Sequence, residues 1–83
     1  MKKYLVDVYL PATGKHYDTY LPAGKQIGEA TKLLVSLAES LTNGSFKGSA
    51  NSLLINADNG EPLSWNNTVH DAGIRNSTGL ILI

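Results

Sequence analysis

The last five residues of the chain, Gly79-Leu80-Ile81-Leu82-Ile83, form an apolar run rich in residues that favour β-strands. A segment of this kind must bury its side chains and find partners for its backbone groups, so it has to be built into a sheet. We therefore expect the C-terminus to be a structural strand and not a free tail. Other elements of the chain must supply the neighbours of this strand.

Length and composition restrict the class of protein. The 83 residues predict one domain, residues 1–83, which buries only about 60 to 65% of the surface that its unfolded chain exposes. The chain has no cysteine, which excludes a disulfide framework and a thiolate metal site. Seven basic and seven acidic residues give a formal net charge of zero, which argues against nucleic acid as a partner.

The N-terminal segment starts like a signal peptide, with Lys2 and Lys3 before an apolar stretch. Asp7 and Pro11 interrupt that stretch too early for an export signal. No apolar run approaches the roughly 20 residues that span a bilayer, so no direct membrane insertion is expected. We predict a cytoplasmic protein.

The first two extended runs predict a hairpin. Residues 3–10 alternate between apolar and mixed positions, and Pro11 and Gly14 supply a turn before residues 15–21, which Pro22 ends because it cannot donate to the ladder. The expected inner residues are Tyr4, Val6, Val8 and Leu10 on the first strand, and Tyr17, Thr19 and Leu21 on the second.

From Ile27 the pattern changes to that of an amphipathic helix, which is predicted to stop at Asn43-Gly44, where Gly can adopt a left-handed cap. Gly28 weakens the first turn by about 1 kcal/mol relative to Ala. The expected inward stripe is Ile27, Ala30, Leu34, Leu37, Ala38 and Leu41. Residues 45–52 read as a loop that Phe46 pins to the core.

The C-terminal half predicts short elements. Residues 52–56 are a third strand, residues 58–60 a turn, and residues 61–65 an edge strand or an irregular return. Residues 68–74 predict a short helical turn capped by Thr68. The order of elements indicates an α+β fold in which a mixed sheet of four to five strands packs on one helix.

This order resembles the β-grasp fold of ubiquitin. The resemblance rests on Thr13-Gly14-Lys15, Leu21-Pro22 and Ile27 at the front, and on Thr68-Val69, Asp71, Ile74, Leu80 and Leu82 at the back. Within that fold the chain is similar to the EsaB/YukD family, through Tyr20-Leu21-Pro22, Asp71-x-Gly73-Ile74-x-Asn76 and its length.

The resemblance implies a non-enzymatic, cytoplasmic accessory or adaptor protein of type VII (WXG100/ESX-type) secretion systems in Gram-positive bacteria, acting through a protein partner such as a component of the secretion machinery. Ubiquitin carries a Gly-Gly tail beyond the last strand, whereas Ile83 is still in the strand here. We therefore expect no conjugation to other proteins.

No catalytic residue, cofactor site or metal site is predicted. His16 and His70 are the only histidines, and neither has a second ligand beside it at metal spacing. We expect both to be exposed structural residues. Gly14-Lys15 and Gly24-Lys25 lack the rest of a phosphate-binding loop.

The candidate functional site is the outer face of the sheet. If Leu80 and Leu82 point inward, the pleat turns Ile81 and Ile83 outward. The predicted protein-interaction face is Leu5, Tyr9, Leu54, Ile81 and Ile83. The alternatives are scattered surface apolar residues or a face covered by residues 45–52.

Two further functions stay open at this point. The chain could be a small ubiquitin-like subunit that braces a multicomponent enzyme such as an oxygenase, or a structural domain that forms a weak homodimer through the same face.

Overall fold

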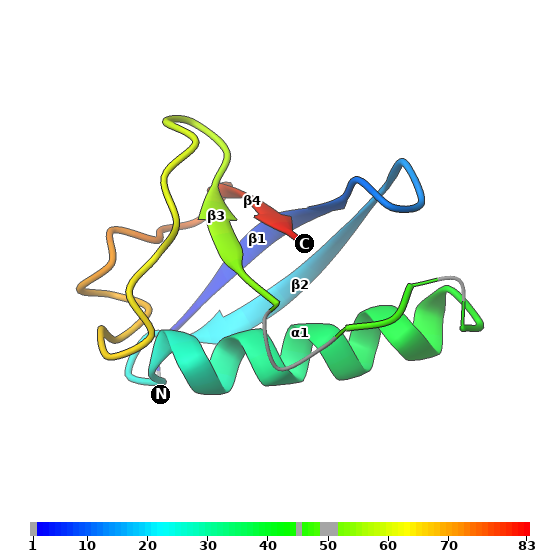
Figure 1. Ribbon diagram of the computed structural model, residues 1–83. Helices are drawn as coiled ribbons and strands as arrows, with labels where there is room; N and C mark the ends of the chain where they lie inside the picture. The colour runs from blue at the N-terminus through cyan, green and yellow to red at the C-terminus, as the bar shows by residue number, and fades with distance from the viewer. Residues whose placement is uncertain (1, 45, 49–51) are drawn as a thin grey trace.

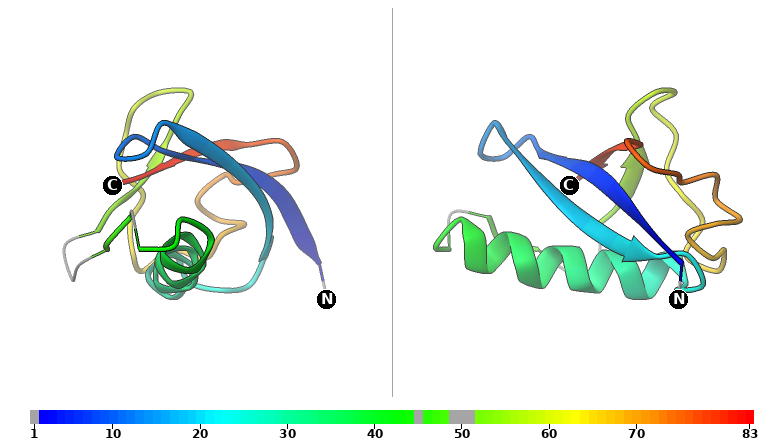
Figure 2. Two further views of the ribbon diagram at one scale, coloured as in Figure 1. Left: turned by 90° about the vertical axis from the view of Figure 1, so that its right-hand side faces the viewer. Right: turned by 180° about the vertical axis from the view of Figure 1, so that it is seen from behind.

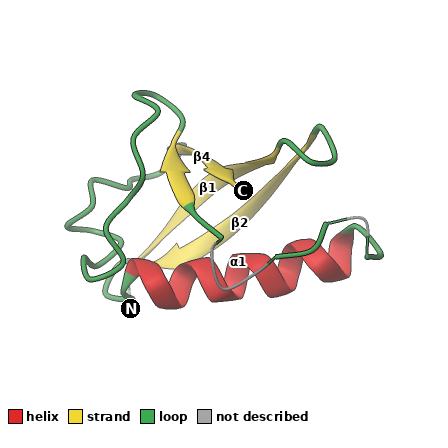
Figure 3. Cartoon of the chain, in the orientation of Figure 1, coloured by secondary structure: helices red, strands yellow, loops and turns green. Residues whose placement is uncertain are grey.

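The computed structural model describes residues 2–44, 46–48 and 52–83, and in these residues one helix lies against a four-stranded sheet (Figures 1 and 3). The elements are β1 (Lys3–Leu10), β2 (Lys15–Pro22), α1 (Ile27–Leu41), β3 (Leu54–Asn56) and β4 (Gly79–Leu82). The strand order is β2-β1-β4-β3, with β1 and β4 parallel and the other pairs antiparallel. The predicted α+β class is confirmed.

The β1–β2 hairpin is the most regular part of the sheet, since the two strands pair without interruption from Lys3 opposite Pro22 to Leu10 opposite Lys15. Gly14 takes a φ of 70°, and the carbonyl of Leu10 accepts hydrogen bonds from the amides of Thr13 and Gly14. The inner set on β1 is confirmed as buried: Tyr4, Val6, Val8 and Leu10. On β2 only Leu21 of the expected inner set is fully buried, while Tyr17 and Thr19 are half-buried.

Helix α1 begins and ends close to the predicted positions. Asn43 and Gly44 take φ values of 56° and 89°, and the Gly44 amide donates to the Glu39 carbonyl at 3.1 Å. The buried aliphatic positions are Ile27, Ala30, Leu34 and Ala38. The prediction that Leu37 and Leu41 point into the core is wrong, because β2 diverges from the helix toward the hairpin turn (Figures 1 and 2) and leaves both partly exposed.

The segment after β3 is an irregular return, one of the two predicted forms. The Asn56 amide donates to the Glu61 carbonyl at 3.0 Å, and Leu63 donates to Leu54 at 2.9 Å. A single bridge joins Ile55 to Pro62. The return therefore covers part of the free edge of β3.

Residues 68–72 close a single helical turn, as predicted, since the Ala72 amide donates to the Thr68 carbonyl at 2.9 Å. The predicted cap is present, since the Thr68 hydroxyl accepts a hydrogen bond from the Asp71 amide at 3.0 Å. Phe46 is buried, which confirms its predicted contact with the core. Residue 45 and residues 49–51 of the predicted loop lie outside the described part of the chain.

The N-terminal end of α1 is closed by a clasp, which we define as residues 67–70 bonded to residues 23–27. The Ile27 amide donates to Asn67 at 2.8 Å, Val69 donates to Lys25 at 2.8 Å, and His70 donates to Ala23 at 2.9 Å. Val69 is completely buried. The clasp fastens the loop before β4 to the loop before α1.

Trp65 covers the first turn of α1 beside the clasp. The Gly28 amide donates to the Trp65 carbonyl at 3.1 Å, and a Cβ added at Gly28 would lie 3.1 Å from Cε3 of the indole. The glycine that the sequence marks as weak for a helix therefore makes room for the tryptophan ring.

All of the core lies between α1 and one face of the sheet. Leu80 and Leu82 point into it, as predicted, together with Leu54 and Ile74. Figure 2 shows the helix on that side, and the described part of the chain has no helix on the other face. The outer face of the sheet is therefore available for the candidate site.

Candidate protein-contact surface

One row of side chains crosses all four strands on the outer face of the sheet. His16 pairs with Tyr9, Tyr9 with Ile81, and Ile81 with Ile55. Residues paired across neighbouring strands point to the same face. The row therefore carries three apolar or aromatic side chains over β1, β4 and β3, and each of these three is half-buried.

Two more apolar side chains, Leu53 and Ile83, lie beside this row on the same face, just outside the ends of β3 and β4. The amide and carbonyl of Ile83 exchange hydrogen bonds with those of Leu53 at 3.1 and 2.9 Å, so the two residues lie opposite one another. Ile83 is 50% exposed and Leu53 is 38% exposed. We call Tyr9, Leu53, Ile55, Ile81 and Ile83 the outer sheet patch.

The prediction that Leu54 faces outward is wrong. Leu54 pairs with the inward-pointing Leu82 and is 1% exposed. The sequence Leu53-Leu54-Ile55 is apolar at every position, so it gives no alternation from which the inner residue can be read. The antiparallel pairing with β4 decides the orientation, and it places Leu53 and Ile55 on the outer face instead.

Leu5 shares the outer face but is separated from the patch. It pairs with Tyr20, its amide donates to Asn76 Oδ1, and its carbonyl accepts from the Ser77 amide. The row formed by Asp18, Asp7 and Gly79 lies between Leu5 and Tyr9. The four predicted residues that do face outward are therefore divided by a polar row, and Leu5 lies on the far side of it.

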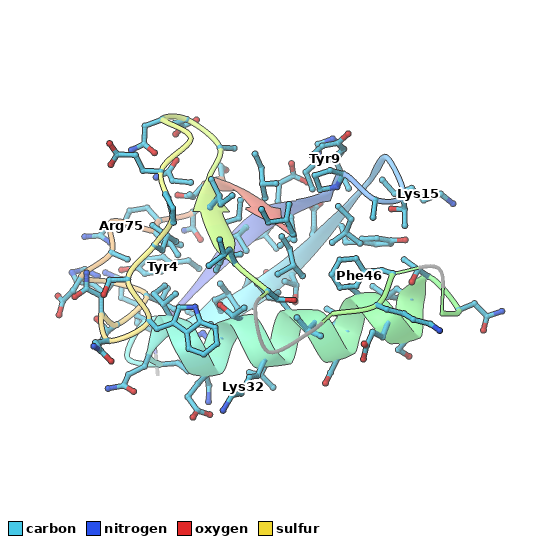
Figure 4. All side chains as sticks on the ribbon, viewed as in Figure 1. Tyr4, Tyr9, Lys15, Lys32, Phe46 and Arg75 are labelled. Atoms are coloured by element: carbon cyan, nitrogen blue, oxygen red, sulfur yellow. The ribbon has the colours of Figure 1, made fainter. Side chains whose placement is uncertain are left out.

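Polar groups border the outer sheet patch on the β2 side. His16 Nδ1 lies 2.8 Å from Asp7 Oδ2, and the Tyr9 and His16 rings lie 4.6 Å apart between centroids. Figure 4 shows Tyr9 near the hairpin, on the side of the sheet away from α1. The arrangement is an apolar surface with a polar border on its β2 side, and polar rims of this kind are typical of protein-contact surfaces.

His70 is exposed, as predicted, and its ring is held by two partners. Nδ1 lies 2.6 Å from Tyr4 Oη, and Nε2 lies 3.2 Å from Nη2 of Arg75. Because a guanidinium only donates, Nε2 of the neutral ring accepts and Nδ1–H donates to the tyrosine. Figure 4 shows Tyr4 and Arg75 at the clasp end of the molecule. These contacts give His70 a structural role.

The described residues contain no group of three or more His, Cys, Asp or Glu side chains that could hold a metal ion. In the same part of the chain, no helix has the length and apolar character needed to cross a bilayer.

No protein-family model matches the chain, and no curated protein matches it either. Several solved structures are similar to it. The EccD5 ubiquitin-like domain from Mycobacterium xenopi is similar over the whole chain and 94% of that domain, at 17% identity and a TM-score of 0.82. A chain of an ESX-5 inner membrane complex free of MycP5 is similar at 18% identity and a TM-score of 0.82, and the present chain spans 21% of it.

A third similar structure is a chain of the toluene 4 monooxygenase HD complex with the inhibitor 4-bromobenzoate. The similarity covers 98% of the present chain and 96% of that chain, at 7% identity and a TM-score of 0.76. At these identities the comparisons establish the ubiquitin-like fold alone.

Proposed function

We propose that the chain is a non-enzymatic, ubiquitin-like accessory or adaptor module of a type VII secretion system, acting in the cytoplasm through protein contacts. Two observations support the system: the likeness over the whole chain to the EccD5 domain and to the ESX-5 complex chain, and the sequence resemblance to the EsaB/YukD family. The outer sheet patch carries the proposed mode of action.

The chemistry of the patch favours a protein partner. Its five side chains are apolar or aromatic, and in the described part of the chain no helix packs over them. Contiguous apolar surface of this kind on a small domain marks an interaction site. The partner supplies a complementary apolar surface, and the Asp7–His16 pair at the border contributes orientation more than affinity.

The test uses a double substitution, Leu53→Lys with Ile83→Glu, in the tagged protein expressed in cells of the source organism. The two positions lie opposite one another, so the new charges attract each other and strand pairing is retained. We expect recovery of the secretion complex to fall at least tenfold.

The control is Lys32→Glu on α1, since Lys32 is exposed, lies away from the outer face and belongs to no exposed apolar surface. It should recover the complex at the level of the parent protein. Unchanged recovery by the double variant, with its fold intact by circular dichroism, would refute the patch as the contact surface.

The second candidate function is a small subunit of a multicomponent enzyme. The observation in its favour is the toluene 4 monooxygenase chain, which has nearly the same length as this one. The same purification separates the two functions: a metal-containing oxygenase in the eluate supports the enzyme subunit, whereas a membrane-embedded secretion complex supports the adaptor.

A third possibility, a weak homodimer through the outer sheet patch, can be tested on the purified protein alone. Sedimentation velocity at increasing protein concentration detects it, and the double variant at Leu53 and Ile83 would abolish it.

A further inference from the structure

The turn after β3 contains one of the two Asn-Gly steps of the chain, Asn59-Gly60, and the other, Asn43-Gly44, follows α1. Because glycine has no side chain, its backbone nitrogen can approach the carboxamide carbon of the preceding asparagine closely. Reaction between these two groups converts asparagine to aspartate or isoaspartate. The two steps have the same chemistry, so any difference between them comes from the fold.

The side chain of Asn59 is folded over Gly60. Its Oδ1 accepts a hydrogen bond from the Glu61 amide at 2.9 Å, which closes an Asx turn. The ring that this bond closes contains both the carboxamide carbon of Asn59 and the amide nitrogen of Gly60. The turn therefore holds the two reacting groups together before the reaction starts.

The same hydrogen bond stabilises the charge that the reaction develops. When a nucleophile adds to the carboxamide carbon of Asn59, negative charge builds up on Oδ1. The Glu61 N–H donates to this oxygen, and the bond strengthens as the oxygen becomes charged. Among the described residues, none donates a hydrogen bond to the side-chain oxygen of Asn43. Only the turn after β3 has this feature of a reactive site.

The Asn59-Gly60 step opens with little disturbance of the fold. Residues 57–62 are all exposed, and Figure 1 shows their loop projecting beyond the sheet. The hydrogen bond from the Gly60 amide to the Asn56 carbonyl, at 2.8 Å, must break before the nitrogen can attack. Exposed loop tips are the parts of a domain that open locally most often.

The Asn43-Gly44 step is held more firmly. The Gly44 amide donates to the carbonyl of Glu39 in α1 at 3.1 Å. The Thr42 hydroxyl accepts from the Phe46 amide at 2.9 Å, and Phe46 is buried. Opening this step therefore disturbs both the end of the helix and a core residue.

We propose that Asn59 is a site of spontaneous modification, where deamidation through a cyclic imide yields aspartate and isoaspartate. Hydroxide removes the Gly60 amide proton, the nitrogen bonds to the carboxamide carbon, and the electron pair of the C=O bond moves to Oδ1. The intermediate expels Nδ2, which takes a proton from water and leaves as ammonia, so hydroxide is regenerated. Water then opens the imide: breaking the new bond gives aspartate, and breaking the original peptide bond gives isoaspartate.

The modification changes the return that covers the edge of β3. It places a negative charge between Asp58 and Glu61, and neighbouring like charges repel. Isoaspartate also adds a methylene group to the backbone of the turn, which the hydrogen bond from the Asn56 amide to the Glu61 carbonyl spans. Deamidation therefore loosens the return beside Ile55 of the outer sheet patch. The assignment of the site is independent of the secretion assignment.

The test is incubation of the purified protein at mildly alkaline pH, followed by digestion and mass spectrometry of the peptides that contain positions 43 and 59. Replacement of NH₂ by OH raises the peptide mass, and liquid chromatography separates isoaspartate from aspartate. We expect the native protein to lose Asn59 at least fivefold faster than Asn43. In guanidinium chloride, where both steps are unfolded, the two rates should agree within twofold.

One variant and one structural readout make the result specific. In Asn59→Gln the carboxamide lies one carbon further away and closes a larger, less favourable imide, so modification at this position should fall at least tenfold while Asn43 reacts as before. Hydrogen exchange at the Asn56 amide, measured by NMR, should be at least threefold faster in aged than in fresh parent protein. Asn59→Gln should remove this difference.

Three results would overturn the proposal. The first is loss of Asn43 in the native protein at the same rate as Asn59 or faster, which would show that the fold does not select Asn59. The second is native Asn59 that stays intact after the unfolded protein has reacted completely, which would show that the turn protects it. The third is unchanged exchange at the Asn56 amide in fully modified protein, which would refute the effect on the return.

Discussion

The two ends of α1 differ in how the rest of the chain covers them. At the N-terminal end Ile27 is completely buried, the clasp bonds the loop before the helix to the loop before β4, and Trp65 lies on Gly28. At the C-terminal end Leu37 and Leu41 are partly exposed beside the free edge of β2. One amphipathic stripe thus has a closed end that stabilises the fold and an open end at which two leucines stay partly exposed.

The largest expected effect tests the closed end. Ile27→Ala removes a fully buried side chain, so we expect the free energy of unfolding to fall by about 3 to 4 kcal/mol. Urea denaturation followed by circular dichroism measures the change. A loss under about 1 kcal/mol would contradict the assignment of Ile27 to the closed end.

A smaller effect is expected from the hydrogen bond that links β1 to the clasp. Tyr4→Phe leaves the ring in the core but removes the hydroxyl group that accepts from His70, at an expected cost of about 1 to 2 kcal/mol. Tyr20→Phe is the control, because Tyr20 is 55% exposed, and its change should stay within about 0.5 kcal/mol. Equal effects of the two substitutions would show that the Tyr4 hydroxyl adds no stability.

A double-mutant cycle tests the contact between Gly28 and Trp65. In the parent protein, Gly28→Ala gains helix propensity of about 1 kcal/mol, but its Cβ presses on the indole, so the net gain should be close to zero. In the Trp65→Ala background the same change should stabilise the protein by about 0.5 to 1 kcal/mol. Identical values in both backgrounds would mean that the ring moves aside freely.

The smallest effect is expected at the open end. Leu41→Gln replaces a side chain that is 51% exposed with another good helix former, so the free energy of unfolding should change by about 0.5 kcal/mol or less. The same denaturation experiment applies. A loss comparable to that of Ile27→Ala would remove the distinction between the two ends.

The sequence predicts those parts of the fold in which alternation or helical period is uninterrupted. On β1 each inner residue is apolar and its neighbours are mixed, so the buried set follows directly. The predicted phase of the apolar stripe on α1 is also correct, since Ile27, Ala30, Leu34 and Ala38 are buried. The period of a helix gives no information on how far the sheet extends along it. For that reason the sequence predicts Leu37 and Leu41 to be buried, whereas the structure leaves both partly exposed.

The candidate site was predicted in part for a related reason. The outward positions of Ile81 and Ile83 follow from the inward leucines of β4, whereas the run from Leu53 to Ile55 has no polar residue to mark a face. Only the pairing of Leu54 with Leu82 orients it. The division of the face by Asp7 likewise depends on the register between β1 and β4, which connects residues more than 70 positions apart.

The parallel pairing of β1 with β4 has a mechanical consequence. These strands lie side by side at the centre of the sheet, and their hydrogen bonds include Ser77 to Leu5 and Asp7 to Thr78. Tension applied at Lys2 and Ile83 pulls the two strands along their length in opposite directions, so these bonds share the load and must fail together. The antiparallel β1–β2 hairpin, pulled at Lys3 and Pro22, opens one pair at a time. We therefore expect the domain to transmit force between its two ends better than its small size suggests.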